Sequence, residues 1–84
     1  MTSPACALTF LSVHDVIKAE KLALAAGLRA RLIPVPKQIS PECGMALQID
    51  CERLSKIEEL LAPLQARRVG SFRIAGAAFE PLEG

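Results

Sequence analysis

Cys43, followed by Gly44, is the residue best placed to do chemistry in this sequence. It lies between a polar segment that contains two prolines, residues 36–42, and the apolar run 45–49. A cysteine thiolate is a nucleophile, and its reactivity depends on exposure and on nearby positive potential. The glycine after it lets a ligand or a backbone segment approach closely. We therefore expect any reaction to be centred on Cys43, where a loop turns into a strand.

The polar candidates also have structural interpretations. A cysteine at the start of a strand is commonly a small, half-buried hydrophobic residue. His14 would be an exposed residue in the first turn of a helix, with no chemical role. Ser12 is typical of a helix N-cap, and it lacks the histidine and acid that would activate its hydroxyl as a nucleophile. The residue types alone leave these interpretations open beside the functional ones.

The spacing of potential ligands argues against a metal or cofactor site. The chain has one histidine and three cysteines, and no two cysteines form a C-x-x-C pair. Structural zinc sites use such clustered ligands. Phosphate-binding loops use a run of glycines, which the segment before Cys43 lacks. We expect neither a metal nor a cofactor.

Composition limits the domain count and the classes of partner. With 84 residues, of which 51% are hydrophobic, the chain should form one domain over residues 1–84. It has no Trp, no Tyr and three Phe, so the core must be aliphatic. A formal net charge of +1 provides no field that would steer the protein to nucleic acid or to an anionic membrane. We expect a partner of neither kind.

The cysteines and the hydropathy pattern suggest a location. Three cysteines cannot all pair within one chain, and their spacing suggests no disulfide framework. We therefore expect reduced thiols and a cytoplasmic protein. The apolar stretch 5–11 follows no positively charged leader, which disfavours a secretory signal. No segment approaches the ~20 apolar residues that a membrane-spanning helix needs.

Hydrophobic periodicity predicts the elements that must position Cys43. Alternating or continuous apolar runs predict four strands, at about residues 5–12, 28–35, 45–49 and 67–74. Apolar residues at helical spacing predict two helices, one over about 14–26 between Ser12 and Gly27 and one from Asp50 to about Ala62. The core would cover about residues 5–75, and the tail 76–84 is expected to be loose.

The predicted order, β-α-β-β-α-β, is that of the ferredoxin-like fold, an α+β arrangement with an antiparallel sheet and two helices on one face. Right-handed crossovers would bring the loop before the third strand to the end of the sheet where the first helix begins. Cys43 would then lie near Ser12, His14 and Asp15, with Lys37 in its own loop. The free N–H groups of the helix start, with His14 or Lys37, would stabilise a thiolate or a persulfide.

The same topology gives expectations for the other cysteines and for two arginines. Cys6 and Cys51 would lie at the opposite end of the sheet, too far from Cys43 to exchange a disulfide with it. Arg67 and Arg68 would begin the fourth strand across from Cys43. Exposed charges of this kind also commonly remain solvated, without a specific role.

Glu20 interrupts the apolar face of the first predicted helix, where its neighbours at helical spacing are apolar. A buried carboxylate needs a partner or stays protonated. Either the helix is rotated slightly, or Glu20 reaches the edge of the helix and pairs with Arg29 or Arg31.

Two longer motifs resemble those of a known family. The run from Ser12 to Lys21 reads S-x-H-D-x-x-x-A-E-K, and the run from Ser40 to Leu47 reads S-x-x-C-G-x-A-L. Together with the segment RLIPVP at 31–36, they resemble the small bacterial proteins labelled "putative Se/S carrier protein-like", over about residues 7–62. The family pattern includes His14, Asp15, Glu20, Cys43 and Gly44.

The resemblance implies a protein that holds sulfur or selenium on Cys43, as a persulfide or selenopersulfide. Such a protein receives the atom from a donor protein and passes it to an acceptor protein. It implies a carrier more than an autonomous enzyme. Cys6 and Cys51 lie outside the shared motifs.

Two other hypotheses come from different classes. Ferredoxin-like domains use the helix-free face of the sheet to form homodimers or to bind a small ligand between subunits, so a regulatory or assembly module is one alternative. Thr9, Leu11, Ala46 and Gln48 would lie on that face. A thiol-dependent oxidoreductase is the other alternative, which the lack of a resolving partner for Cys43 disfavours.

Overall fold

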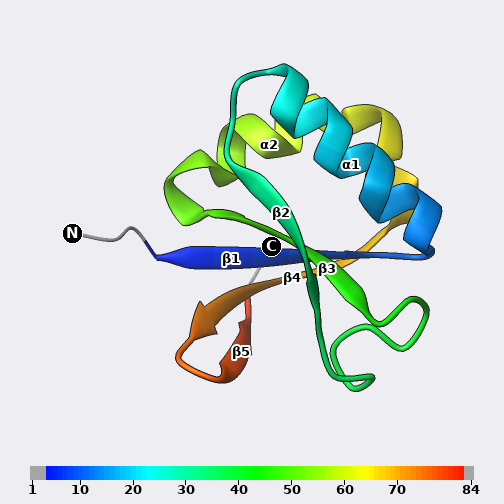
Figure 1. Cartoon of the computed structure of the whole chain (residues 1–84), viewed down its shortest axis with the longest axis vertical. Helices are drawn as coiled ribbons and strands as arrows, with labels where there is room; N and C mark the ends of the chain where they lie inside the picture. The colour runs from blue at the N-terminus through cyan, green and yellow to red at the C-terminus, as the bar shows by residue number, and fades with distance from the viewer. Residues whose placement is uncertain (1–3, 83–84) are drawn as a thin grey trace.

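An antiparallel sheet of five strands forms the centre of the computed structural model, which describes residues 4–82 except for the side chains of residues 65–67. The strands lie in the order β2-β3-β1-β4-β5, and every neighbouring pair is antiparallel (Figure 1). Their bounds are β1 Ala5–Phe10, β2 Ala30–Pro34, β3 Met45–Asp50, β4 Arg68–Ala75 and β5 Ala78–Pro81.

The fifth strand corrects the predicted fold class. The protein is α+β with an antiparallel sheet and two α-helices, but β5 adds an edge strand that the ferredoxin-like order does not contain. The tail was expected to be loose, which is wrong for residues 78–81. Phe79 is opposite Ile74 and Glu80 is opposite Arg73, across a tight turn in which Gly76 adopts a φ of +62°. A turn this short requires a positive φ, which glycine adopts without a steric penalty.

Helix α1, Val13–Ala25, begins and ends close to the residues that the sequence indicated. The Ser12 hydroxyl accepts a hydrogen bond from the backbone N–H of Asp15, which satisfies one of the free donors of the first turn. After the helix, Gly27 has a φ of +78°, the conformation that commonly terminates helices.

The second helical segment is more broken than predicted. Helix α2 covers only Leu54–Leu60, between the 3₁₀ helices η1, Cys51–Arg53, and η2, Ala62–Arg67. The sequence predicted that this helix starts at Asp50, a residue type typical of an N-cap, but the Asp50 side chain makes no capping hydrogen bond. Pro63 removes a backbone donor, in keeping with the end of the α-helix at Leu60. None of the helices in the described part of the chain is long and apolar enough to cross a membrane.

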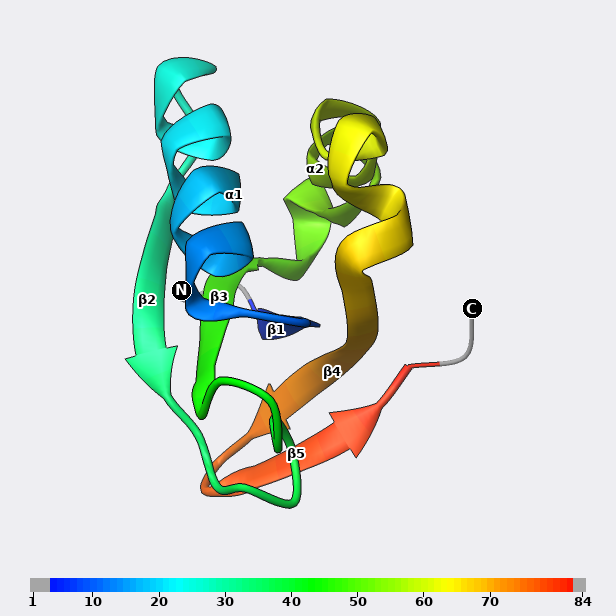
Figure 2. The same cartoon turned by 90° about the vertical axis from the view of Figure 1, so that its right-hand side faces the viewer.

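The main core lies between the sheet and the two helices, which cover one face of it (Figures 1 and 2). Alternate residues of β1 point into this core, because side chains along a strand alternate between its two faces. Small residues on α1 let the helix approach the sheet closely. The fully buried core side chains include Cys6, Leu8, Phe10, Val16, Ala19, Ala23, Leu47, Ile57 and Leu61.

The other face of the sheet is not open, contrary to expectation. Thr9 and Ala46 are 0% exposed. Figure 2 shows the segment between β2 and β3 and the β4–β5 hairpin on the side of the sheet away from the helices. At Gly70 a Cβ atom would lie 3.4 Å from the Phe72 ring and 3.5 Å from Thr9 Oγ1, so the ring packs close to the sheet. Leu11 is exposed and Gln48 is half-buried.

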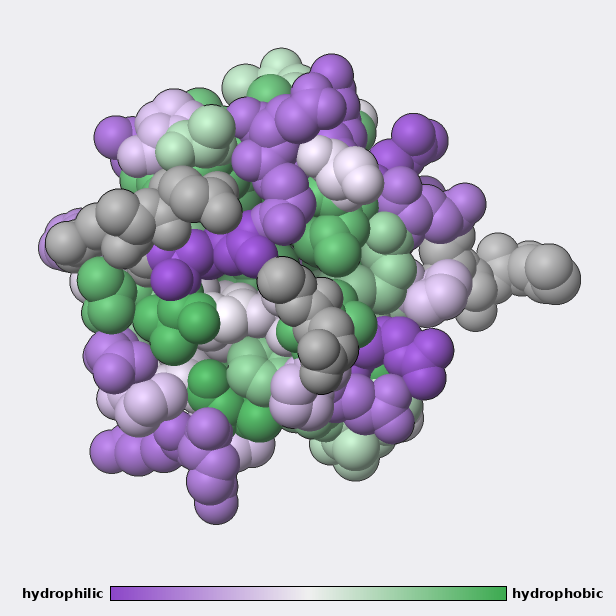
Figure 3. Space-filling model, turned by 180° about the vertical axis from the view of Figure 1, so that it is seen from behind, coloured by the Kyte–Doolittle hydropathy of each residue, from purple (hydrophilic) through white to green (hydrophobic). Residues whose placement is uncertain are grey.

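Apolar surface remains in smaller areas. The exposed large hydrophobic side chains are Leu11, Val13, Leu24 and Val69. On the face seen from behind in Figure 3, hydrophobic residues form several areas between hydrophilic ones. Such scattered exposure is common on soluble domains and does not by itself identify an interface.

Candidate functional site

Cys43 is half-buried at the end of a hydrogen-bonded loop that leads into β3. The Gly44 N–H donates to the Ser40 carbonyl at 2.8 Å, and the Ser40 N–H donates to the Pro36 carbonyl at 3.1 Å. The Val35 N–H donates to the Gly44 carbonyl at 3.0 Å, which closes the base of the loop. Gly44 has a φ of +67°, a conformation that residues with a side chain rarely adopt. These hydrogen bonds and the Gly44 conformation therefore fix the backbone that carries the thiol.

The sulfur atom is surrounded by oxygen atoms. Cys43 Sγ lies 3.3 Å from Ser40 Oγ and 3.3 Å from the Met45 carbonyl oxygen. A longer contact of 3.9 Å reaches the carbonyl oxygen of Phe10. A protonated thiol can donate to either carbonyl, whereas Ser40, which is only 1% exposed, can donate its hydroxyl proton to a thiolate. Ser40 is the residue at this site that the functional interpretation of the sequence missed, although it belongs to the S-x-x-C-G motif.

The contact with Phe10 places the sulfur at the end of β1 that leads into α1. Phe10 is the last residue of β1, and α1 begins at Val13. Loop and helix start therefore meet, as the topological argument expected. The hydrogen bonds of the described residues, however, link none of the predicted polar side chains of α1 to the sulfur.

Ser12 and Asp15 are engaged with each other. Ser12 Oγ accepts from the Asp15 N–H at 3.3 Å and donates to Asp15 Oδ2 at 3.0 Å. This is a capping interaction that organises the start of α1. His14 is exposed on the same turn. Within the described residues, none of these three side chains makes a hydrogen bond to Cys43.

Lys37 and Glu20 are the other charged residues that the sequence indicated. Lys37 is exposed in the turn before Ser40 and makes no hydrogen bond to the sulfur within the described residues. Glu20 is half-buried on α1, and no ion pair joins it to Arg29 or Arg31 in the part of the chain that the structure describes.

Arg68, the first residue of β4, is paired with a residue of α2 and not with Cys43. Arg68 forms an ion pair with Glu58 of α2, and burial lowers the pKa of its guanidinium. Its side chain is only 14% exposed. The side chain of Arg67 lies outside the described residues.

The other two cysteines form a disulfide, so the expectation of reduced thiols is wrong. Cys6 and Cys51 are bonded, with their Cα atoms 5.1 Å apart, and Cys43 is the free cysteine. The register explains the pairing: Ala5 is opposite Asp50, so Cys6 in β1 and Cys51 just after β3 are neighbours. Their shared location at one end of the sheet was the signal in the sequence, and spacing alone did not reveal it.

Cys43 does not line the pocket at the other end of β3. This pocket, of about 430 Å³, has Leu24, Arg31 and Asp50 among its lining residues. Among residues 4–82, no cluster of three or more His, Cys, Asp or Glu could hold a metal ion.

Comparison with known proteins gives one match. The model of the family described as "Putative Se/S carrier protein-like" matches residues 5–66, most of the chain. The match includes both the loop that carries Cys43 and the whole of α1. Neither a curated protein nor a solved structure matches the chain.

Proposed function

The chain belongs to the family described as "Putative Se/S carrier protein-like", and from this we propose that it carries sulfur or selenium on Cys43, as a persulfide or selenopersulfide. The observation that carries the assignment to Cys43 is the state of the three cysteines. Cys6 and Cys51 are bonded to each other, which leaves Cys43 as the free thiol.

A carrier thiol must keep its cargo until the acceptor arrives. A neighbouring free cysteine would attack the persulfide, form a disulfide and release the cargo as sulfide. Cys6 and Cys51 cannot do so while they are bonded, and both belong to the end of β1 and β3 away from Cys43. The arrangement therefore supports storage of a sulfane sulfur atom on this residue.

The transfer step needs no external oxidant. The Cys43 thiolate attacks the terminal sulfur of a donor protein's persulfide, a new S–S bond forms, and the donor's S–S bond breaks. The electron pair of that bond leaves on the donor cysteine as a thiolate, which takes up a proton. An acceptor thiolate repeats the same step on the persulfide of Cys43. The oxidation level of the transferred atom is conserved in each transfer, and selenium follows the same scheme.

We propose that the Ser40 hydroxyl stabilises the anion on Cys43 by donating a hydrogen bond to it. Its hydroxyl is 3.3 Å from the sulfur and almost fully buried. The sequence also indicated His14, Asp15 and Lys37. For these residues we propose only a place on the surface that contacts a partner protein. Gly44 is assigned to the backbone conformation that presents the thiol.

The partners are a donor protein and an acceptor protein of sulfur or selenium. The family description supports a carrier over an autonomous enzyme, because the reacting groups of a carrier come from other proteins. The expected cytoplasmic location depended on reduced thiols, which the Cys6–Cys51 disulfide contradicts, so it is not part of the proposal. A homodimer through the sheet face is not proposed, since Thr9 and Ala46 on that face are fully buried.

Mass spectrometry tests the proposal. The protein is incubated with a persulfide donor, and the intact mass is taken before and after a reducing agent. We expect a gain of one sulfur atom in the wild type, located on Cys43 by peptide mapping, and its loss on reduction. The Cys43→Ser variant should gain nothing, and the Lys18→Gln variant, changed at an exposed position of α1, should load normally. Sulfane sulfur that persists in Cys43→Ser would refute the assignment.

A further inference from the structure

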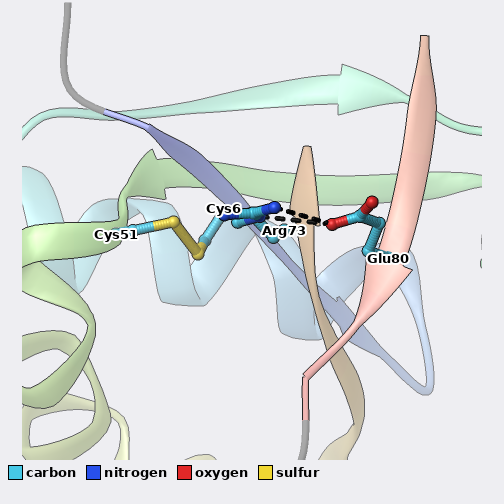
Figure 4. A network of polar contacts seen from close by, with 4 residues as sticks. All are labelled: Cys6, Cys51, Arg73 and Glu80. Carbon is cyan, nitrogen blue, oxygen red and sulfur yellow. Dashed lines mark hydrogen bonds and ion pairs between the residues drawn. A yellow bond between two sulfur atoms is a disulfide. The ribbon is translucent and has the colours of Figure 1, made fainter. Parts of the chain in front are cut away.

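The Cys6–Cys51 disulfide is asymmetric in its access to solvent. Cys6 is 1% exposed near the start of the central strand β1, whereas Cys51 is half-buried at the start of η1. Figure 4 shows the bond spanning from β1 to the chain that follows β3. A thiol from solution can therefore approach this disulfide more readily from the side of Cys51.

A pair of opposite charges lies on the Cys6 side of the bond. Arg73 of β4 is the cross-strand neighbour of Cys6, so their side chains share one face of the sheet. Its Nε and Nη2 donate to Glu80 Oε1 of β5 at 3.3 and 3.0 Å. In Figure 4 the guanidinium is turned toward Glu80, away from the disulfide. The positive charge of Arg73, across the strand from Cys6, is thus offset by a carboxylate.

We propose that the Cys6–Cys51 disulfide is a second site of sulfur chemistry, at which an external thiol attacks Cys51 and Cys6 is the leaving group. The charge pair Arg73–Glu80 sets how readily Cys6 leaves. The substrate class is a low-molecular-weight or protein thiol, and the reaction is thiol–disulfide exchange. This site is independent of Cys43 and of the carrier role.

The exchange balances with two external thiols. The first thiolate forms a bond to Cys51 Sγ while the Cys51–Cys6 bond breaks, and the electron pair leaves on Cys6 Sγ, which then takes up a proton. A second thiolate attacks the external sulfur of the mixed disulfide and releases Cys51 as a thiolate. The two external thiols are oxidised to a disulfide, and the protein disulfide is reduced by the same two electrons.

Substitutions in the charge pair should change the rate of disulfide reduction in opposite directions. The departure of Cys6 is faster when a nearby cation stabilises its thiolate. Glu80→Gln leaves Arg73 uncompensated and free to turn toward Cys6, so it should accelerate reduction. Arg73→Gln leaves Glu80 as the nearer charge, so it should slow reduction. An exposed charge changes such a rate roughly twofold to fivefold.

Glutathione is the probe, and the Cys43→Ser background removes the free thiol from the measurement. The full-length protein is treated with reduced glutathione, quenched with an alkylating agent and mapped by mass spectrometry. We expect the mixed disulfide on Cys51, with alkylation on Cys6. Cys6→Ser offers a second measurement, in which Cys51 alone forms a stable adduct with oxidised glutathione. Persistence of the reaction in Cys43→Ser keeps the outcome separate from that of the carrier proposal.

The charge variants are then compared at equal glutathione concentration, with Lys18→Gln as a control for the loss of an exposed charge. Thermal unfolding of each variant shows whether the β4–β5 pairing is kept. A mixed disulfide on Cys6, or no reduction under conditions in which the protein stays folded, would overturn the proposal. Equal rates in Glu80→Gln and Arg73→Gln would overturn the role of the charge pair.

Discussion

Ser40 Oγ lies 3.3 Å from Cys43 Sγ, and the serine is 1% exposed while the cysteine is half-buried. The two side chains belong to one loop, in which the Gly44 N–H bonds back to the Ser40 carbonyl. The hydroxyl is thus held by the loop itself. It offers a proton to a sulfur anion in a place where the other neighbours of the sulfur are carbonyl oxygens.

Ser40→Ala should make Cys43 a poorer nucleophile. Without the hydroxyl, a thiolate would face the Phe10 and Met45 carbonyls with no donor. We expect alkylation of Cys43 at neutral pH to slow roughly threefold to tenfold, the equivalent of one hydrogen bond. Ser55→Ala, at an exposed serine of α2, is the matched control and should react like the wild type. If both variants react at the wild-type rate, Ser40 does not support the anion.

Removal of the disulfide should destabilise the domain substantially. Cys6 and Cys51 are separated by 45 residues in the sequence, and a cross-link over a loop of this length stabilises a protein by about 4 kcal/mol in the chain-entropy model. We therefore expect the double variant Cys6→Ala with Cys51→Ala to lose much of its free energy of unfolding, as measured by urea denaturation.

Cys43→Ala provides the comparison for that experiment, since it removes a thiol outside the cross-link. We expect it to cost less than the double variant, because Cys43 is half-buried on a loop. A double variant as stable as Cys43→Ala would show that the cross-link contributes little to the folded state.

Gly44→Ala should disturb the loop that presents the thiol. No atom lies within 4 Å of the position that its Cβ would take, so the cost comes from the φ of +67° and not from a clash. A left-handed conformation costs an ordinary residue about 1–2 kcal/mol, and each kcal/mol lowers the melting temperature of a domain this small by about 4–8 °C. Gly44→Asn should lose less, because asparagine tolerates this conformation. Melting curves of the two variants test this explanation. An equal decrease in melting temperature in both would contradict an origin in the backbone conformation.

Much of the local structure was predictable because it depends on neighbours in the chain. The Ser12 cap, the end of α1 before Gly27 and the strand that begins at Met45 all follow from residue type and periodicity. The topological argument also placed the Cys43 loop near the start of α1, and the contact between the sulfur and the Phe10 carbonyl agrees with it. The roles expected of His14 and Lys37 remain predictions without a contact to support them.

Other features depended on which segments meet in space. β5 forms because β4 offers an unpaired edge within reach of a two-residue turn, which composition does not reveal. The face of the sheet away from the helices is covered because a long loop and a curved hairpin lie on that side. Arg68 pairs with Glu58 instead of facing Cys43, since the start of β4 lies next to α2.

Residue order was sufficient to predict that Cys43 ends a proline-containing loop, next to Gly44 and within a motif that resembles a known family. Which of the three cysteines is free depends on how the strands pair in the folded chain. Strand register brings Cys6 and Cys51 within bonding distance although 45 residues separate them, and the same register keeps Cys43 at the far end of β3. Pairing of this kind is a property of distances in space, which linear spacing does not encode.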